Sequence, residues 1–172
     1  MGGTGRHKLV VTTPSETEIV MTRVFDAPRE LVFEAHTSCE HLSRWWGPRA
    51  YETVACEVDF RTGGSWRIVH RGPDGDEIAF FGDYLEIVRP ERIVWTFAFE
   101  GLTGQEGLSG GPAPETMTFE ERDGTTTITT TSVFPSAEVR DLVLESGMEE
   151  GAVETYERLD EYLVTLRERA AG

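Results

Sequence analysis

The feature that most constrains the fold is an amphipathic helix pattern that follows a long run of strands. Residues 50–134 predict successive strands, after which the chain turns helical. The last helical segment begins near Gly147 and carries small and apolar residues on one face: Gly151, Ala152, Thr155, Leu159, Tyr162, Leu163 and Leu166. A single long helix after an antiparallel sheet buries such a face most readily on the concave side of that sheet. Because Gly151 and Ala152 are small, the pattern predicts a cavity between sheet and helix.

Length and composition indicate one globular domain. The chain has 172 residues, of which 38% are hydrophobic and 27% charged. We expect residues 1–17 to form a flexible N-terminal arm and residues 18–169 to form the domain. No apolar run approaches the roughly 20 residues that span a bilayer, and the polar arm lacks an apolar signal core. These features predict a cytoplasmic protein without membrane insertion.

The charge balance and the cysteines exclude several kinds of partner. The formal net charge of −15 disfavours nucleic acid and anionic membranes, both of which need clustered Lys and Arg. The two cysteines, Cys39 and Cys56, lack the spacing of a zinc site and are expected as reduced thiols. We therefore expect neither a metal nor another cofactor.

Turn signals divide the chain into strands and helices. A first strand is predicted over residues 18–25, and a helix start follows at residues 26–30, with Asp26 as the capping carboxylate. The remaining expected elements are a short helix over 39–45, strands near 50–59, 64–71, 77–88, 91–100, 115–122 and 125–134, a helix over 136–146 and the long helix over 148–169. Short Gly- and Asp-containing links between the strands favour antiparallel neighbours.

One connection is unusually long and rich in glycine. Residues 101–114 contain five glycines and two prolines. Such a segment is either a tolerated surface insertion or a lid over the mouth of the cavity, and the sequence leaves both interpretations open.

Alternation along the strands indicates which side chains face the helix. In residues 91–100 the large residues share one parity, and shorter versions of the pattern occur in 64–71 and 115–122. In 77–88 both parities are apolar, so the faces are ambiguous, and the threonine run 125–131 is uninformative. The candidate ligand-binding residues are Trp46, Trp66, Ile68, His70, Phe81, Trp95, Phe97, Phe99, Met117, Phe119, Met148, Gly151, Ala152 and Thr155. Each aromatic residue could equally be plain core, so the prediction depends on the whole set.

Catalytic motifs are absent from the sequence. His70 is the notable polar residue on the predicted inner face; it is either a satisfied core histidine or a group that bonds a ligand or transfers a proton. Carboxylates are plentiful, but none forms an obvious catalytic pair, and no phosphate loop or nucleophile elbow is present. We predict no catalytic residue.

Several segments, in order and spacing, resemble a known family. They are Phe25–Phe33, Trp45–Pro48, Asp59–Trp66, Gly82–Ile87, Pro90–Thr96 and Gly147–Gly151, with Tyr156, Leu159, Tyr162 and Leu163. The chain resembles the SRPBCC (START-like) superfamily and, within it, the family related to the activator of heat-shock-protein-90 ATPase. The resemblance implies an α+β helix-grip fold: a curved seven-stranded antiparallel sheet wrapped around a long C-terminal helix, with two short helices after the first strand.

The resemblance also implies a hydrophobic cavity, since superfamily members bind lipids, sterols or polyketides and some cyclise polyketides. We therefore expect binding of a small hydrophobic molecule of lipid, polyketide or aromatic type, without catalysis. A cyclase- or hydrolase-type enzyme and a co-chaperone-like interaction domain are the alternatives. A homodimer is possible, and the sequence does not decide the oligomeric state.

Overall fold

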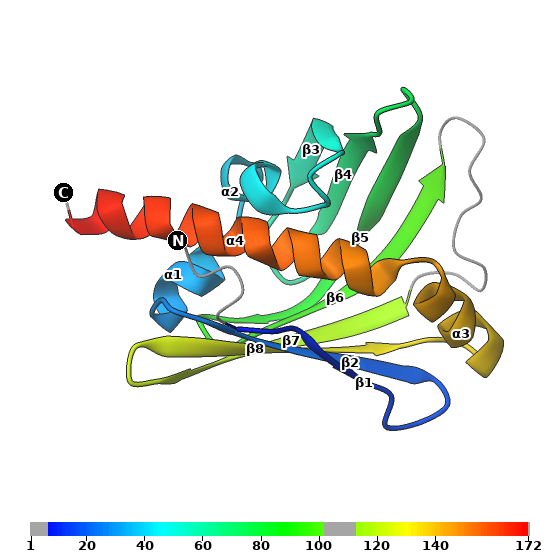
Figure 1. The fold of residues 1–172 in the computed structure, drawn as a ribbon, viewed down its shortest axis with the longest axis horizontal. Coiled ribbons are helices and arrows are strands. Elements are labelled where there is room, and N and C mark those ends of the chain that lie inside the picture. Colours follow the sequence, from blue (N-terminus) through cyan, green and yellow to red (C-terminus); the bar gives the residue numbers. More distant parts are fainter. Residues whose placement is uncertain (1–6, 102–112, 172) are drawn as a thin grey trace.

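The computed structural model describes residues 7–101 and 113–171, in which a curved antiparallel sheet wraps around a long helix (Figure 1). The described residues form eight strands in the order β1-β2-β8-β7-β6-β5-β4-β3. The strands are β1 (Val10–Thr12), β2 (Glu18–Phe25), β3 (Glu52–Val58), β4 (Ser65–Arg71), β5 (Glu77–Val88), β6 (Arg92–Gly101), β7 (Ala113–Arg122) and β8 (Thr125–Val133). The helices are α1 (Arg29–Glu34), α2 (Cys39–Trp45), α3 (Ala137–Glu145) and α4 (Met148–Ala171).

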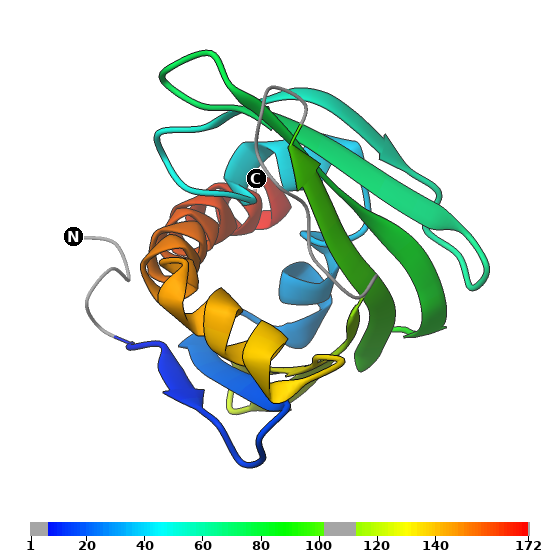
Figure 2. The same ribbon diagram turned by 90° about the vertical axis from the view of Figure 1, so that its right-hand side faces the viewer.

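The view along the molecule shows how the sheet and α4 enclose an interior (Figure 2). The sheet curves around one side of α4, and α1 and α2 lie at the end of this arrangement near the C-terminus (Figures 1 and 2). Both short helices follow β2 in the chain, as the helix-grip fold requires. This confirms the predicted α+β helix-grip fold, with one strand more than the seven expected.

The additional strand comes from the segment that was expected to be a flexible arm. Val10, Val11 and Thr12 pair antiparallel with Thr22, Met21 and Val20 of β2. The added strand covers an edge of β2 that would otherwise present unpaired backbone groups. Three residues are too few for a periodic pattern to be visible in sequence, which is why the expectation was wrong for residues 10–12.

Two helix starts follow the capping chemistry, and that of α1 does not. Ser38 and Ser136 cap α2 and α3, their hydroxyls accepting from the backbone N–H of His41 at 3.3 Å and of Val139 at 3.2 Å. The exception is α1, where Pro28 occupies the cap position without a side-chain bond, so the predicted Asp26 cap is wrong. Asp26 instead contacts His7 at 3.0 Å. The backbone N–H of Arg29, the first residue of α1, donates instead to Glu121 Oε1 at 2.8 Å, which satisfies one of the free donors at this helix start.

The core lies between the concave side of the sheet and the inner face of α4. That face contributes buried residues at helical spacing: Tyr156, Leu159, Asp160, Tyr162, Leu163 and Leu166. They pack with Phe25, Val32, Phe33, Trp45 and Trp66, among others. Side chains fill the space between this part of α4 and the sheet. Open space is therefore confined to the N-terminal turns of α4.

The two cysteines form a disulfide, which corrects the expectation of reduced thiols. Cys39 at the start of α2 and Cys56 in β3 are bonded, with their Cα atoms 5.8 Å apart. Their separation of 17 positions matches no sequence motif, and they meet because α2 packs on β3. The bond ties α2 to the edge strand of the sheet.

Two sequence predictions fall on residues that the structure does not describe. Residues 1–6 of the expected arm and most of the 101–114 connection lie outside the described residues. The predicted lid therefore stays a prediction.

Candidate ligand-binding cavity

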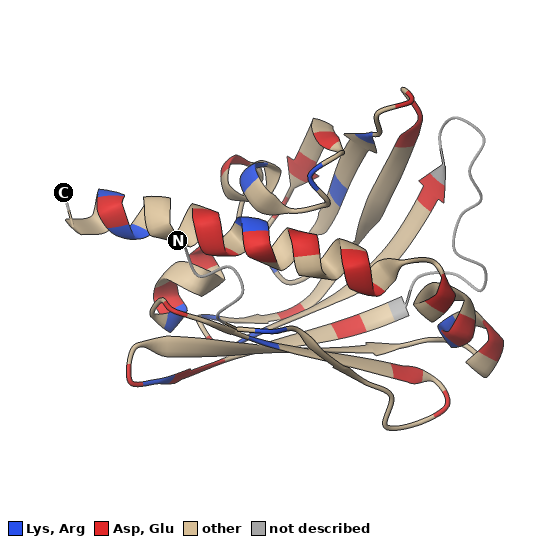
Figure 3. Cartoon of the chain, in the orientation of Figure 1, with Lys and Arg blue, Asp and Glu red and all other residues tan. Residues whose placement is uncertain are grey.

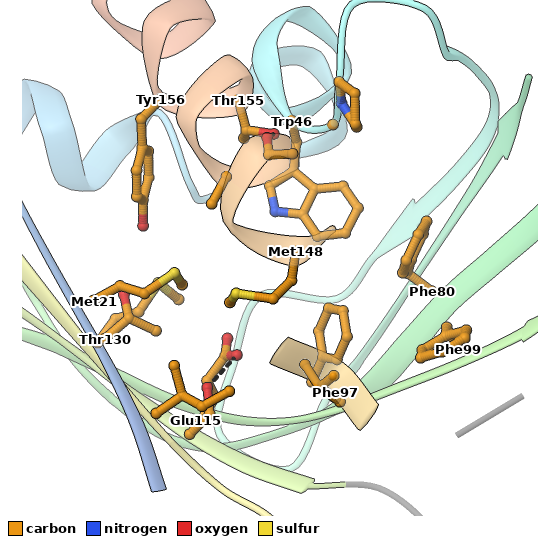
Figure 4. Close-up of a pocket in the computed structure, with 18 of the residues that line it drawn as sticks. Met21, Trp46, Phe80, Phe97, Phe99, Glu115, Thr130, Met148, Thr155 and Tyr156 are labelled. Carbon is orange, nitrogen blue, oxygen red and sulfur yellow. Dashed lines mark hydrogen bonds between the residues drawn. The ribbon is translucent and has the colours of Figure 1, made fainter. Parts of the chain in front are cut away.

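A cavity of about 270 Å³ lies between the sheet and the first turns of α4 (Figure 4). Most of the predicted ligand-binding residues line it: Trp46, His70, Trp95, Phe97, Phe99, Met117, Met148, Gly151, Ala152 and Thr155. The small residues of α4 leave this space. A Cβ added to Gly151 would meet Pro48 Cγ at 3.7 Å, an ordinary contact, so the helix approaches the Gly47–Pro48 corner without crowding.

Three predicted residues lie in the core instead of the cavity wall. Trp66 stacks on Trp95 with ring centroids 4.3 Å apart and is covered by it. Ile68 is buried in the core cluster. Phe119 packs edge-on against Phe33 at 5.1 Å. Strand parity identified their face correctly, but helices α1 and α2 cover this part of the sheet.

Phe81 is not among the residues that line the cavity, and Phe80 lines it in its place. In the strand register Phe80 pairs with Ile68 and Phe99, which share the inner face. Phe81 pairs with Arg67, whose guanidinium lies 6.0 Å from the Phe81 ring. Both parities of β5 are apolar, so only the register with neighbouring strands distinguishes the two residues.

Sequence reasoning missed the wall formed by β2 and β8 and, in β7, all lining residues except Met117. The additional lining residues are Ile19, Met21, His36, Trp45, Gly47, Pro48, Phe80, Glu115, Thr130, Ser132, Phe134, Val143 and Tyr156. A signal was present for some of them. Glu115 has the same parity as Met117 and Phe119, and Thr130 and Ser132 have the parity of Ile128.

Glu115 supplies a half-buried carboxyl group in an otherwise mainly apolar wall. Its Oε1 accepts from Trp95 Nε1 and its Oε2 accepts from Ser132 Oγ, both at 2.8 Å. Trp95, Glu115 and Ser132 form one cross-strand row, because Glu115 pairs with Trp95 on β6 and with Ser132 on β8. Burial raises the pKa of Glu115, and the hydrogen bonds from Trp95 and Ser132 oppose that rise.

His70 lies on the β4 side of the cavity among aromatic rings. Its ring lies 5.4 Å from those of Trp46 and Phe80. Burial lowers the pKa of His70 to about 4, the positive charge of Arg158 lowers it further, and a hydrogen bond with the Trp46 backbone opposes both. His70 is therefore neutral near pH 7. Gly47 permits this packing, because a Cβ there would lie 2.2 Å from His70 Cε1.

Two further polar groups complete the cavity lining. Burial raises the pKa of Tyr156 to about 12, so its hydroxyl stays protonated; in Figure 4 that hydroxyl points toward Thr130. His36 Nδ1–H donates to Val32 O at 2.8 Å, and burial lowers the pKa of His36 to about 4. At neutral pH neither residue brings a charge to the cavity.

The described residues show no group of three or more His, Cys, Asp or Glu side chains placed to hold a metal. None of the helices in the described part of the chain is long and apolar enough to cross a membrane. The arrangement is suited to enclosing a mainly apolar molecule and offering it a few polar contacts.

A curved antiparallel sheet closed by a long C-terminal helix, with a cavity between them, defines a helix-grip protein of the START-like class. The family model described as activator of Hsp90 ATPase homolog 1-like protein matches residues 26–164, and the chain belongs to this family.

Solved structures with the same fold come from several bacteria. A Rhodobacter sphaeroides protein is 25% identical with a TM-score of 0.83, covering 92% of this chain and 99% of its own. A Mycobacterium smegmatis protein is 25% identical with a TM-score of 0.80 over 91% and 97%. An Arthrobacter aurescens protein is 27% identical with a TM-score of 0.80 over 91% of both chains. The comparison with curated proteins finds no match.

Proposed function

We propose that the protein binds a small hydrophobic molecule in the cavity between the sheet and α4. The observation that carries this proposal is a set of large apolar side chains that line the cavity and are only half-buried: Met21, Trp46, Phe80, Phe97, Phe99 and Met148. A ligand would remove this surface from water at about 25 cal/mol per Å².

The size of the cavity favours a compact ligand. Its 270 Å³ is close to the lower limit of about 300 Å³ for ligand pockets. Among lipid, polyketide and aromatic ligands, this volume supports a fused-ring aromatic or short polyketide-like molecule over a long acyl chain.

Catalysis on such a ligand is the second candidate, and Glu115 is the observation that favours it. A carboxyl group with a raised pKa is suited to act as a general acid. His70 is also in the cavity wall and is neutral near pH 7, so its ring is suited to hydrogen-bond a substrate. Cyclase- or hydrolase-type chemistry would require a substrate held between these two groups.

Fluorescence titration with N-phenyl-1-naphthylamine, which is uncharged near neutral pH, tests the binding proposal. Ala152 lines the cavity, whereas the adjacent Val153 is 38% exposed on the outer face of α4. We expect Ala152→Phe to fill the cavity and weaken probe binding by about tenfold or more, and Val153→Phe to bind as the wild type does. Equal binding by all three proteins would show that the probe does not enter the cavity and would contradict the proposal.

A further inference from the structure

The Glu115 carboxyl group lines the cavity and, among the described residues, has no cationic partner in the hydrogen bonds that it makes. Its two partners, Trp95 Nε1 and Ser132 Oγ, are neutral donors. A carboxylate has about four lone-pair sites, so each oxygen retains capacity for another donor. Figure 4 shows the group pointing into the cavity, on the side opposite Met148 of α4. The unused hydrogen-bond acceptor sites of Glu115 are therefore directed at the space that a ligand would occupy.

We propose that the ligand carries a positively charged amine on a compact aromatic body, and that Glu115 binds this amine. The inference rests on the proposed function and specifies the chemical class of its ligand. A buried carboxylate is costly unless it is paired with a charge, and an ammonium group inside the cavity supplies that charge.

The remaining wall suits an organic cation better than an anion. Phe97, Phe99 and Trp46 face the same cavity, and the faces of aromatic rings attract cations. No Lys lines the cavity, and no Arg lines it, within the described residues. A fatty acid or another carboxylate ligand would meet Glu115 without any compensating cation.

The charge of the whole chain points to the same ligand class. The net charge is −15, and acidic residues run along α4, over the cavity (Figure 3). Glu149 and Glu150 occupy the first turn of this helix, next to the lining residues Met148 and Gly151. A negative surface raises the local concentration of cations and lowers that of anions.

Three probes that share one aromatic body test the inference by isothermal titration calorimetry. They are 1-naphthalenemethylamine, which is cationic, 1-naphthalenemethanol, which is neutral, and 1-naphthoic acid, which is anionic. The wild type should bind the amine about tenfold or more tighter than the alcohol, and the acid most weakly. Glu115→Gln keeps the size and an acceptor oxygen, and should reduce the preference for the amine over the alcohol to within about twofold.

The outcomes separate this inference from the proposed function. If the alcohol binds and the amine binds no tighter, or if Glu115→Gln retains the preference for the amine, the inference is wrong and the binding function stands. If none of the three probes binds the wild type, the proposed function fails and the inference fails with it.

A pH series on the wild type keeps the inference testable if Glu115→Gln does not fold. The ratio of amine to alcohol affinity should fall as the pH is lowered from about 8 to about 5, because protonation removes the charge of Glu115. The titratable and charged groups packed around the cavity are Tyr156, the mutually bonded Arg23 and Asp160, His36, and His70 with the neighbouring Arg158. With pKa values of about 12 for Tyr156 and about 4 for both histidines, these three stay uncharged over this range. An unchanging ratio would overturn the inference.

Discussion

Arg23 of β2 and Asp160 of α4 form an ion pair inside the protein, with side chains 3% and 6% exposed. Arg23 Nη1 also donates to Val24 O at 2.6 Å, and its guanidinium lies 4.8 Å from the centre of the Phe25 ring. Burial raises the pKa of Asp160, while the hydrogen bond and charge of Arg23 oppose that rise. The pair joins the sheet to α4, one helical turn after the cavity-lining residue Tyr156.

Removal of one member of this pair should destabilise the protein strongly. Asp160→Asn leaves a buried guanidinium without a counter-charge, and we expect it to lower the free energy of unfolding by about 3–5 kcal/mol. Urea denaturation measures the change. Arg49 and Glu161, the residue of α4 that follows Asp160, form a solvent-exposed pair, so Arg49→Met is the matched control and should cost at most about 1 kcal/mol. Similar losses of stability in both variants would contradict the conclusion that Arg23 and Asp160 form a buried ion pair.

The disulfide should contribute measurably to stability. Cys39→Ser/Cys56→Ser removes a bond that closes 17 positions of chain, and the expected loss is about 3 kcal/mol in the free energy of unfolding. Thiol titration of the denatured wild type should detect free thiols only after reduction. Dithiothreitol should lower the urea midpoint of the wild type to that of the double variant and leave the double variant unchanged. Two free thiols in the unreduced wild type would refute the bond.

Acidification should destabilise the protein through its buried histidines. Burial lowers the pKa of His36 to about 4 in the folded protein, against about 6.5 when unfolded. Between these values the unfolded state binds more protons, so stability falls as the pH drops from about 6.5 to about 4, by up to about 3 kcal/mol for this residue.

His36→Phe provides the check on this pH dependence. The ring of His36 packs against Trp45 at 4.8 Å and Phe119 at 5.2 Å, so phenylalanine retains aromatic contacts but cannot take up a proton. Urea denaturation at about pH 7 and about pH 5 should show a smaller loss of stability in the variant than in the wild type. The same loss in both proteins would mean that His36 is not responsible.

Gly47 should tolerate no side chain. It has φ of +107°, and a Cβ would lie 2.2 Å from His70 Cε1, so Gly47→Ala combines backbone strain with a clash. Gly75→Ala isolates the strain, because Gly75 has φ of +85° with nothing within 4 Å of its added Cβ. We expect Gly75→Ala to lower the free energy of unfolding by about 1–2 kcal/mol, and Gly47→Ala to lower it by about 1–3 kcal/mol more. Thermal unfolding of the two variants side by side measures the difference, and equal losses would show that His70 moves away freely.

Strand periodicity was sufficient to predict the sheet, its antiparallel links and the helix on its concave side. It also identified the inner face wherever one parity was clearly apolar, as in β6, where Trp95, Phe97 and Phe99 all line the cavity. It was insufficient in β5, where Phe80 and Phe81 are equally apolar, and in the threonine-rich β8, because alternation carries information only when the two faces differ in polarity.

The sequence by itself determined the helix-grip fold and a space beside Gly151 and Ala152, because element type and small side chains are local properties of the chain. Tertiary structure alone decided that Trp95, Glu115 and Ser132 form one row, that Cys39 meets Cys56, and that Arg23 pairs with Asp160. These contacts depend on strand register and helix docking. Such features are set by the sum of many weak packing interactions across the fold, which no short stretch of sequence encodes.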